Sequence, residues 1–340
     1  MRDYPIVYFY SGKVLPKYAR KSIAHATRTW GDKVSLLTDV DHSDLGARVE
    51  VIDYRGWFDP SEFESAVRSH RLDSGFRGGF WSRTLLRFFV LEQFMKLHSV
   101  ERLLHLELDS VLFITKQEFE GLSLDAEGLY IPWAPGSLAI GSFVYINNHN
   151  SLSSLVEFAA TGPRFENEMQ LLTNFLEQRP QYARGLPTAD QMMNRFRDFK
   201  PMNSIPPGDS EFVFDANRLG MWTYGTDPKN TKGLFSFNHF AEPRLSSIPK
   251  LGCTTSGLPT IVNREGGPPK RIANVHMHSK RVAQAIRPLE RLLWFQIANL
   301  PFKVIVGLNV RRRLAPPVKS FIKLVDKTLY RAFQTYSRRL

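Results

Sequence analysis

The sequence predicts an α/β fold with a mostly parallel, Rossmann-like central sheet flanked by helices. Three observations support this class. Short β-rich apolar runs alternate with stretches that have helical spacing, the early strands end in polar residues, and the 340 residues are 43% hydrophobic and 23% charged, as in ordinary folded proteins. Strands that are joined by helices run parallel, and ligands bind beyond their carboxyl ends. Function is therefore expected at that edge of the sheet.

The elements are expected in a regular order. A strand over 5–10 precedes a helix over 17–30 that Gly31 ends, and strands follow over 33–38 and 48–53. Apolar residues at helical spacing predict a helix over 80–97. Further strands are expected over 102–109 and 143–147, a helix over 151–160 with Ser151 as its N-cap, and long ordered loops over 203–269.

The charge distribution separates a body from a tail. Nearly all of the net charge of +12 comes from residues 281–340, so the rest of the chain is close to neutral. Cys253 is the only cysteine, which excludes an intrachain disulfide and a thiolate metal cluster and fits a reducing compartment. The apolar run at 6–10 is too short for a signal peptide. We therefore expect a cytoplasmic protein.

Two acids interrupt an apolar stretch in the middle of the chain. Glu107 and Asp109 follow the run Leu103–Leu106, and another apolar run, Val111–Phe113, comes directly after them. Carboxylates two positions apart at the end of a strand project from one side of the chain and can hold a hard divalent cation. A strand end with solvated acids is the alternative interpretation.

This pattern resembles the D-x-D region of GT-A glycosyltransferases, with Glu107 in place of the usual first Asp. The resemblance implies a GT-A fold, a UDP- or GDP-linked sugar as donor, and Mn²⁺ or Mg²⁺ at the donor diphosphate. It makes Asp109 the first metal ligand and Glu107 the second, with a further contact of Glu107 to the nucleotide.

Thr188–Asn194 contains a second motif. It is similar to the D-Q pattern of the retaining family 8 enzymes, which include glycogenin and lipopolysaccharide galactosyltransferases. The resemblance gives Asp190 and Gln191 catalytic positions beside the donor sugar, whereas the family's second Asp is replaced by Met192. An Asp at the start of a helix is also an ordinary N-cap, and that alternative stays open.

The third motif combines two imidazoles and an amine. On an extended segment, His276, His278 and Lys280 would share one face. In family 8 a late His completes the metal site and a nearby Lys binds the diphosphate. The resemblance therefore implies His276 and His278 as metal ligands and Lys280 as a donor-binding residue, although the family's spacing is longer.

Other candidates have weaker patterns. The residues expected to bind the donor nucleotide end the first two strands or lie on the helix over 80–97: Tyr8, Tyr10, Ser11, Asp39, Arg83 and Arg87. Ser142, Trp222 and Asp227 are expected on the acceptor side. Ser142 precedes a strand that resembles the one beneath the acceptor pocket, Trp222 can stack on a sugar face, and Asp227 lies in a segment over 225–230 that resembles loops of bacterial surface-polysaccharide transferases.

The tail has an apolar stripe beside a basic one. Its basic and apolar candidates for membrane contact are Arg311, Arg312, Arg313, Lys319, Phe321 and Lys323. A basic amphipathic helix of this kind lies in a bilayer interface, and the interrupted apolar stretch before it is too polar to span. The expected division is a GT-A catalytic domain over 1–282 and a basic amphipathic helical tail over 283–340.

Together these features predict a glycosyltransferase on the inner face of the cell membrane. It would move a sugar from a nucleotide-sugar donor to a lipid-linked or surface-glycan acceptor, and no nucleic acid is expected as a partner. Two alternatives stay open. One is a metal-dependent hydrolase using His276 and His278, and the other is a non-catalytic protein that binds through its basic tail.

Overall fold

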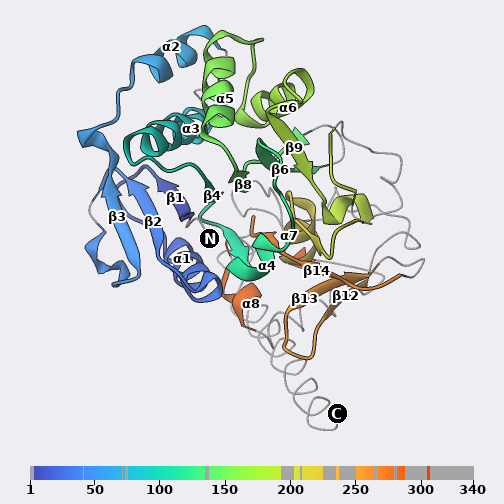
Figure 1. The fold of residues 1–340 in the computed structure, drawn as a ribbon. Helices are drawn as coiled ribbons and strands as arrows, with labels where there is room; N and C mark the ends of the chain where they lie inside the picture. Colours follow the sequence, from blue (N-terminus) through green and yellow to red (C-terminus); the bar gives the residue numbers. More distant parts are fainter. Residues whose placement is uncertain are drawn as a thin grey trace.

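The structure is a computed structural model that describes residues 4–40, 42–70, 72, 76–134, 138–192, 203–206, 209–224, 235–236, 250–262, 267–278, 280, 282–287 and 305–306. Its main sheet has the strand order β3-β2-β1-β4-β8-β6-β7, with β9 paired to β6 (Figure 1). Its strands are β1 (Ile6–Tyr10), β2 (Val34–Thr38), β3 (Val49–Asp53), β4 (Leu103–Leu106), β6 (Leu129–Ala134), β7 (Leu138–Ala139), β8 (Phe143–Ile146) and β9 (Ala183–Leu186).

Most strands of this sheet run the same way. The pairs β1–β2, β2–β3, β1–β4 and β6–β9 are parallel, whereas β8 is antiparallel to both β4 and β6. β6 therefore has the direction of β4, and only β7 and β8 run against the rest. The expectation of a mixed α/β fold with a mostly parallel sheet is confirmed.

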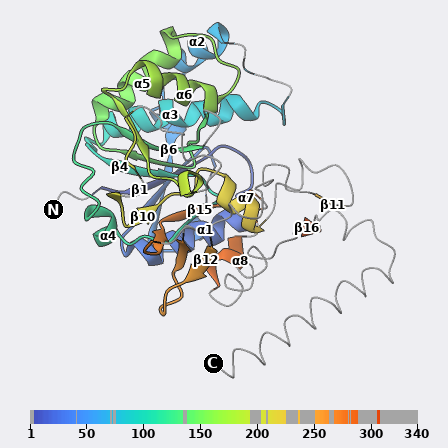
Figure 2. The same ribbon diagram turned by 90° about the vertical axis from the view of Figure 1, so that its right-hand side faces the viewer.

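Helices cover both faces of the sheet. The helices of the described part are α1 (Lys17–Trp30), α2 (Ser61–Ser69), α3 (Phe80–Leu97), α4 (Lys116–Glu120), α5 (His149–Thr161), α6 (Glu168–Gln178), α7 (Arg218–Tyr224) and α8 (Val282–Ile286). α3, α5 and α6 lie on one face and α1 on the other (Figures 1 and 2). Side chains alternate along β1, so that Val7 joins the cluster under α3 while Ile6 and Tyr8 join the cluster under α1.

The predicted bounds of α1 and α3 agree with the structure, including Gly31 at the end of α1 with a φ of 79°. α5 begins earlier than predicted. Its N-cap is Asn148, whose side chain accepts a hydrogen bond from the N–H of Asn150 at 2.6 Å, and Ser151 lies inside the helix. Asn148 rather than Ser151 is the N-cap because its side-chain oxygen satisfies an N–H group of the first turn that has no partner within the helix.

The segment expected to form loops also contains regular structure. A second sheet has the order β10-β14-β13-β12, and two pairs of short strands lie outside both sheets. The strands within that segment are β10 (Phe212–Val213), β11 (Phe235–Ser236), β12 (Lys250–Cys253) and β13 (Pro259–Val262). Their partners outside it are β14 (Lys270–Ile272) and β16 (Ile305–Val306), and the remaining pair is β5 (Ser110–Leu112) with β15 (Asn274–His276). β12 and β13 pair across a short connection, whereas β10–β14, β11–β16 and β15–β5 join distant segments, which a single-sequence pattern does not reveal.

The predicted tail falls almost wholly outside the described residues. Of its first part, Ala285 is buried in the cluster that also holds Val275 and Met277, so α8 packs against the body. Arg311, Arg312, Arg313, Lys319, Phe321 and Lys323 lie outside the described residues. Among the helices of the described part, none is both long and apolar enough to cross a bilayer.

Candidate active site

The two acids lie in the turn between β4 and β5. β4 ends at Leu106, and the N–H of Ser110 donates to the carbonyl of Glu107 at 2.9 Å, which closes a turn. The N–H of Glu107 donates to the carbonyl of Ser142 at 3.0 Å, so the turn is fixed to the neighbouring strand β8. The carboxylates are thus brought together by a turn, and the expectation of a continuous strand through both acids is wrong.

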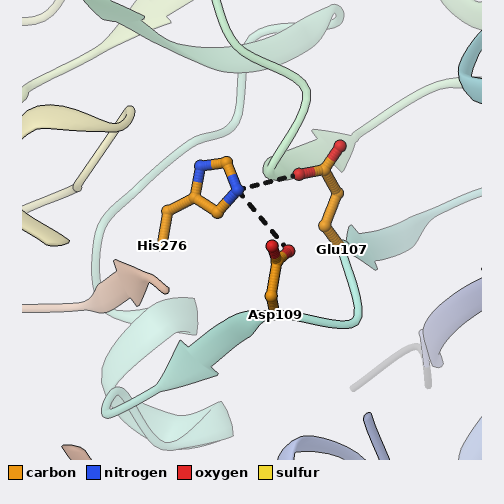
Figure 3. A group of neighbouring side chains, drawn as sticks. All are labelled: Glu107, Asp109 and His276. Atoms are coloured by element: carbon orange, nitrogen blue, oxygen red, sulfur yellow. Dashed lines mark ion pairs between the residues drawn. The ribbon is translucent and has the colours of Figure 1, made fainter. Parts of the chain in front are cut away.

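A late segment of the chain completes the cluster. β15 pairs antiparallel with β5, placing His276 opposite Ser110, and the N–H of Met277 donates to the carbonyl of Asp109 at 2.8 Å. His276 Nε2 lies 3.1 Å from Glu107 Oε2 and 3.5 Å from Asp109 Oδ1 (Figure 3). One ligand atom from each of these three residues lies within 4.8 Å of the others.

His276 is oriented from behind by Asp215 and Ala216. Its backbone N–H donates to Asp215 Oδ2 at 2.9 Å, and its Nδ1–H donates to the carbonyl of Ala216 at 3.0 Å. The ring therefore presents Nε2 to the two carboxylates, an arrangement that fixes the tautomer of metal-binding histidines. Asp215 also accepts the N–H groups of Leu219 and Gly220 at 3.0 and 2.8 Å.

Sequence reasoning did not find this role of Asp215. The sequence feature that could have revealed this role is an Asp just before α7, where a carboxylate satisfies N–H groups of the first turn. Gly220 belongs to the same arrangement, since a side chain there would collide with the carbonyl of His276. Burial raises the pKa of Asp215 to about 6, although three N–H groups and His276 favour the charged form.

The charges of the cluster compensate one another. Burial alone would raise the pKa of Glu107, but the charges of Arg87 and His276 hold it well below its usual range. Asp109 behaves in the same way, with Lys280 and His276 outweighing burial. Burial would lower the pKa of His276, yet Asp109 and Glu107 raise it well above its usual value. The buried carboxylates and the cations around them therefore stabilise one another's charged forms.

Lys280 reaches Asp109 by a turn. Its N–H donates to the carbonyl of Met277 at 2.7 Å, its φ is 57°, and its ammonium group contacts Asp109 Oδ2. The predicted extended segment is thus wrong beyond β15, because the chain turns after His276. The ring of His278 packs on that of His276 with 4.1 Å between centroids, and burial lowers its pKa well below its usual value. Among the described residues, His278 lies outside the cluster of possible metal ligands.

Arg87 faces the cluster but is enclosed by protein. Its side chain is 5% exposed, Nη1 donates to Glu107 Oε1 at 2.6 Å, and Nη2 contacts Glu168 Oε1 at the start of α6. Burial would lower the pKa of Arg87, but Glu168 and Glu107 raise it. Burial and the nearby charge of Glu107 raise the pKa of Glu168 to about 7, although Arg87 favours its charged form. The expected contact of Arg87 with a donor is replaced by these two ion pairs.

Four other predicted donor residues lie at the ends of β1 and β2 or near them. Ser11 Oγ donates to Asp39 at 2.8 Å, and the hydroxyl of Tyr10 donates to the carbonyl of Val14 at 2.6 Å. Arg83 is exposed and donates to the carbonyl of Gly78 at 2.8 Å. Tyr10, Ser11 and Asp39 share the carboxyl edge with the β4–β5 turn because β1 is parallel to β2 and β4, whereas Arg83 lies on α3.

The remaining predicted residues are placed as follows. Tyr8 is fully buried in the core under α1, so its ring cannot meet a ligand at the surface, and the expectation of a nucleotide contact is corrected. Ser142 is also buried, and its hydroxyl donates to the carbonyl of Ala216 at 3.3 Å. Gln191 Oε1 accepts the N–H of Thr188 at 2.8 Å within a short 3₁₀ turn, Ala189–Met192.

Three predicted side chains cannot be placed. The backbone of Asp190 lies in the same 3₁₀ turn, but its side chain is outside the described part, as is that of Trp222 in α7. Asp227 lies outside the described residues altogether. Their catalytic and acceptor-side roles stay predictions.

Comparison with known proteins gives only distant likenesses. No protein-family model matches the sequence, and no curated protein is similar to it. The match to mouse xyloside xylosyltransferase 1 covers 58% of this chain and 90% of that protein, with 10% identity and a TM-score of 0.38. The glycosyltransferase PaToxG matches 52% of this chain over 70% of its own, with 16% identity and a TM-score of 0.36.

A glycosyltransferase involved in the glycosylation of the major capsid of PBCV-1 matches 56% of this chain over 84% of its own, with 13% identity and a TM-score of 0.32. Likenesses at this level do not establish a shared fold or activity. The function is therefore argued from the geometry of this chain.

Proposed function

We propose that the protein is a nucleotide-sugar-dependent glycosyltransferase of the GT-A type. One observation carries the proposal. Glu107, Asp109 and His276 come from segments far apart in the sequence and converge at the carboxyl edge of a mostly parallel sheet, where such folds bind their ligands.

The donor set fits a divalent cation. Two carboxylate oxygens and one imidazole nitrogen suit Mn²⁺, and carboxylate oxygens also suit Mg²⁺. Nδ1 of His276 already donates to the backbone carbonyl of Ala216, which leaves Nε2 as the ligand atom. A cation held there would neutralise charge on the departing diphosphate of a nucleotide sugar.

Neighbouring side chains have clear tasks in this proposal. Lys280 supplies a second positive charge beside Asp109, where a diphosphate would lie. Ser11 and Asp39 offer polar groups to a nucleoside at the adjacent strand ends. The hydrolase alternative needed both imidazoles as ligands, whereas the cluster of described residues contains His276 alone.

The direct test measures donor binding. We expect Mn²⁺ together with a UDP- or GDP-linked sugar to raise the melting temperature of the wild-type protein, because a ligand that binds only the native state stabilises it. Asp109→Ala should abolish this shift and sugar transfer. Asp44→Ala is the matched control, since Asp44 is an exposed acid paired with Arg20. Full transfer by Asp109→Ala, or hydrolysis of phosphoesters without donor specificity, would contradict the proposal.

The acceptor and the location form a separate part of the proposal. A basic amphipathic tail on an otherwise neutral enzyme suits a lipid-linked or surface-glycan acceptor at the inner face of the cell membrane. Flotation of the full chain with anionic liposomes tests this. Binding to oligonucleotides instead of liposomes would favour the non-catalytic tail-binding alternative.

A further inference from the structure

Arg87 divides its guanidinium between two acids. Nη1 donates to Glu107 Oε1 at 2.6 Å, and Nη2 contacts Glu168 Oε1. The side chains of Arg87 and Glu168 are 5% and 4% exposed, so water cannot replace either partner. Three separate elements meet here, namely α3, the β4–β5 turn and α6.

This division determines which oxygen of Glu107 is free. A guanidinium facing a carboxylate without a competitor binds both oxygens in a fork. Because Glu168 holds one nitrogen of Arg87, only Oε1 of Glu107 is bound by it. Oε2 is left to face His276 Nε2 at 3.1 Å, inside the cluster of possible metal ligands.

Gly141 makes room for the contact. A side chain at this position would collide with both Arg87 Nη2 and Glu168 Oε1. Gly141 does not have a positive φ, so its backbone does not require glycine. The chain therefore keeps a glycine where a methyl group would separate Arg87 from Glu168.

We propose that Glu168 is a positioning residue that holds one arm of Arg87 and so keeps Glu107 Oε2 available to a divalent cation. The inference rests on the proposed function, in which Glu107, Asp109 and His276 bind that cation. Glu168 itself touches neither the cation nor the donor.

The first test changes the charge of Glu168. Glu168→Gln is nearly isosteric. We expect it to weaken binding of Mn²⁺ alone about tenfold in isothermal titration calorimetry, because substitutions behind the metal ligands commonly reduce metal affinity by that factor. The matched control is Glu118→Gln, which makes the same chemical change in the Glu118–Arg271 ion pair, outside the cluster. It should bind Mn²⁺ like the wild type.

The second test changes no charge. Gly141→Ala places a methyl group between Arg87 and Glu168, and we expect it to weaken Mn²⁺ binding while the full chain still melts cooperatively. Gly56→Ala is its control, because a methyl group there meets no atom within 4 Å. A crystal structure of either test variant should show both terminal nitrogens of Arg87 on Glu107.

The outcomes separate this inference from the proposed function. If the wild type binds Mn²⁺ and Asp109→Ala does not, but Glu168→Gln and Gly141→Ala bind it as tightly as the wild type, the role of Glu168 is refuted and the metal site stands. Equal weakening in Glu168→Gln and Glu118→Gln also overturns the role, since it shows a general charge effect. Absence of Mn²⁺ binding in the wild type overturns both proposals.

Discussion

Strand β4 contains one buried histidine and the turn that follows it contacts another, and their surroundings leave the first neutral and the second charged. His105 in β4 is 1% exposed, its Nδ1–H donates to the carbonyl of Val7 at 2.9 Å, and burial with the nearby charge of Arg87 lowers its pKa to about 3. His276 beside the turn is 6% exposed, yet two carboxylates raise its pKa well above its usual value. Burial therefore excludes a charge only where no opposite charge is buried with it.

The largest expected effect concerns the neutral histidine. In the folded chain His105 has a pKa of about 3 against 6.5 when unfolded, so the unfolded state binds more protons between these values. The free energy of unfolding should therefore fall as the pH drops from 6.5 toward 3, by up to about 5 kcal/mol.

His105→Asn keeps a donor for the Val7 carbonyl but cannot titrate. Its urea unfolding, measured at several pH values, should show a shallower fall of stability with acid than the wild type. An unchanged slope would show that His105 does not carry this pH dependence.

The next effect concerns the guanidinium of Arg87, which lies near both regions. Arg87→Met leaves Glu107 and Glu168 buried without their guanidinium, and we expect a loss of about 3–5 kcal/mol in the free energy of unfolding at neutral pH. Arg271→Met, in a more exposed ion pair, should cost about 1 kcal/mol or less. Equal losses in the two variants would remove the distinction between buried and surface charge.

The smallest effect has the opposite sign to that of His105. Asp215 has a folded pKa of about 6 against an ordinary value of 3.8, so the folded state binds more protons between them. Its contribution is fully present below pH 3.8 and is lost as the pH rises through 6, by up to about 3 kcal/mol.

Asp215→Asn should abolish that loss while weakening the bond to the N–H of His276. Unfolding measured between pH 4 and pH 7 checks the slope. Asn148→Ala, which removes the N-cap of α5, serves as control and should cost about 1 kcal/mol at every pH. A slope in the Asp215 variant equal to that of the wild type contradicts the assignment.

Local patterns predicted much of the fold. The bounds of α1 and α3 follow from apolar spacing and from a terminal glycine, and the early strands follow from β-rich runs. The turn at Glu107 was not predictable, because the apolar run on both sides suits one continuous strand. The strands after residue 203 are only two to four residues long, and β10, β11 and β15 pair with strands that are distant in sequence.

The site was predicted in part for a similar reason. Glu107, Asp109, His276 and Lys280 stood out because their residue types suit metal and diphosphate chemistry. Glu168 and Gly141 gave no comparable signal, since a glutamate at a helix start and a glycine before a strand are common. Their importance comes from contact with Arg87, which only the folded chain reveals.

Because β15 pairs with β5, the two halves of the site are synthesised at different times during translation. Lys280 follows Asp109 by 171 positions, so a ribosome that adds about 5–20 residues per second needs roughly 10–30 s to make the second half of the site after the first. Throughout that interval the nascent carboxylates lack the imidazole and the ammonium group that later neutralise them. A polypeptide released before β15 is made would contain both acids but not the imidazole and the ammonium group that neutralise them.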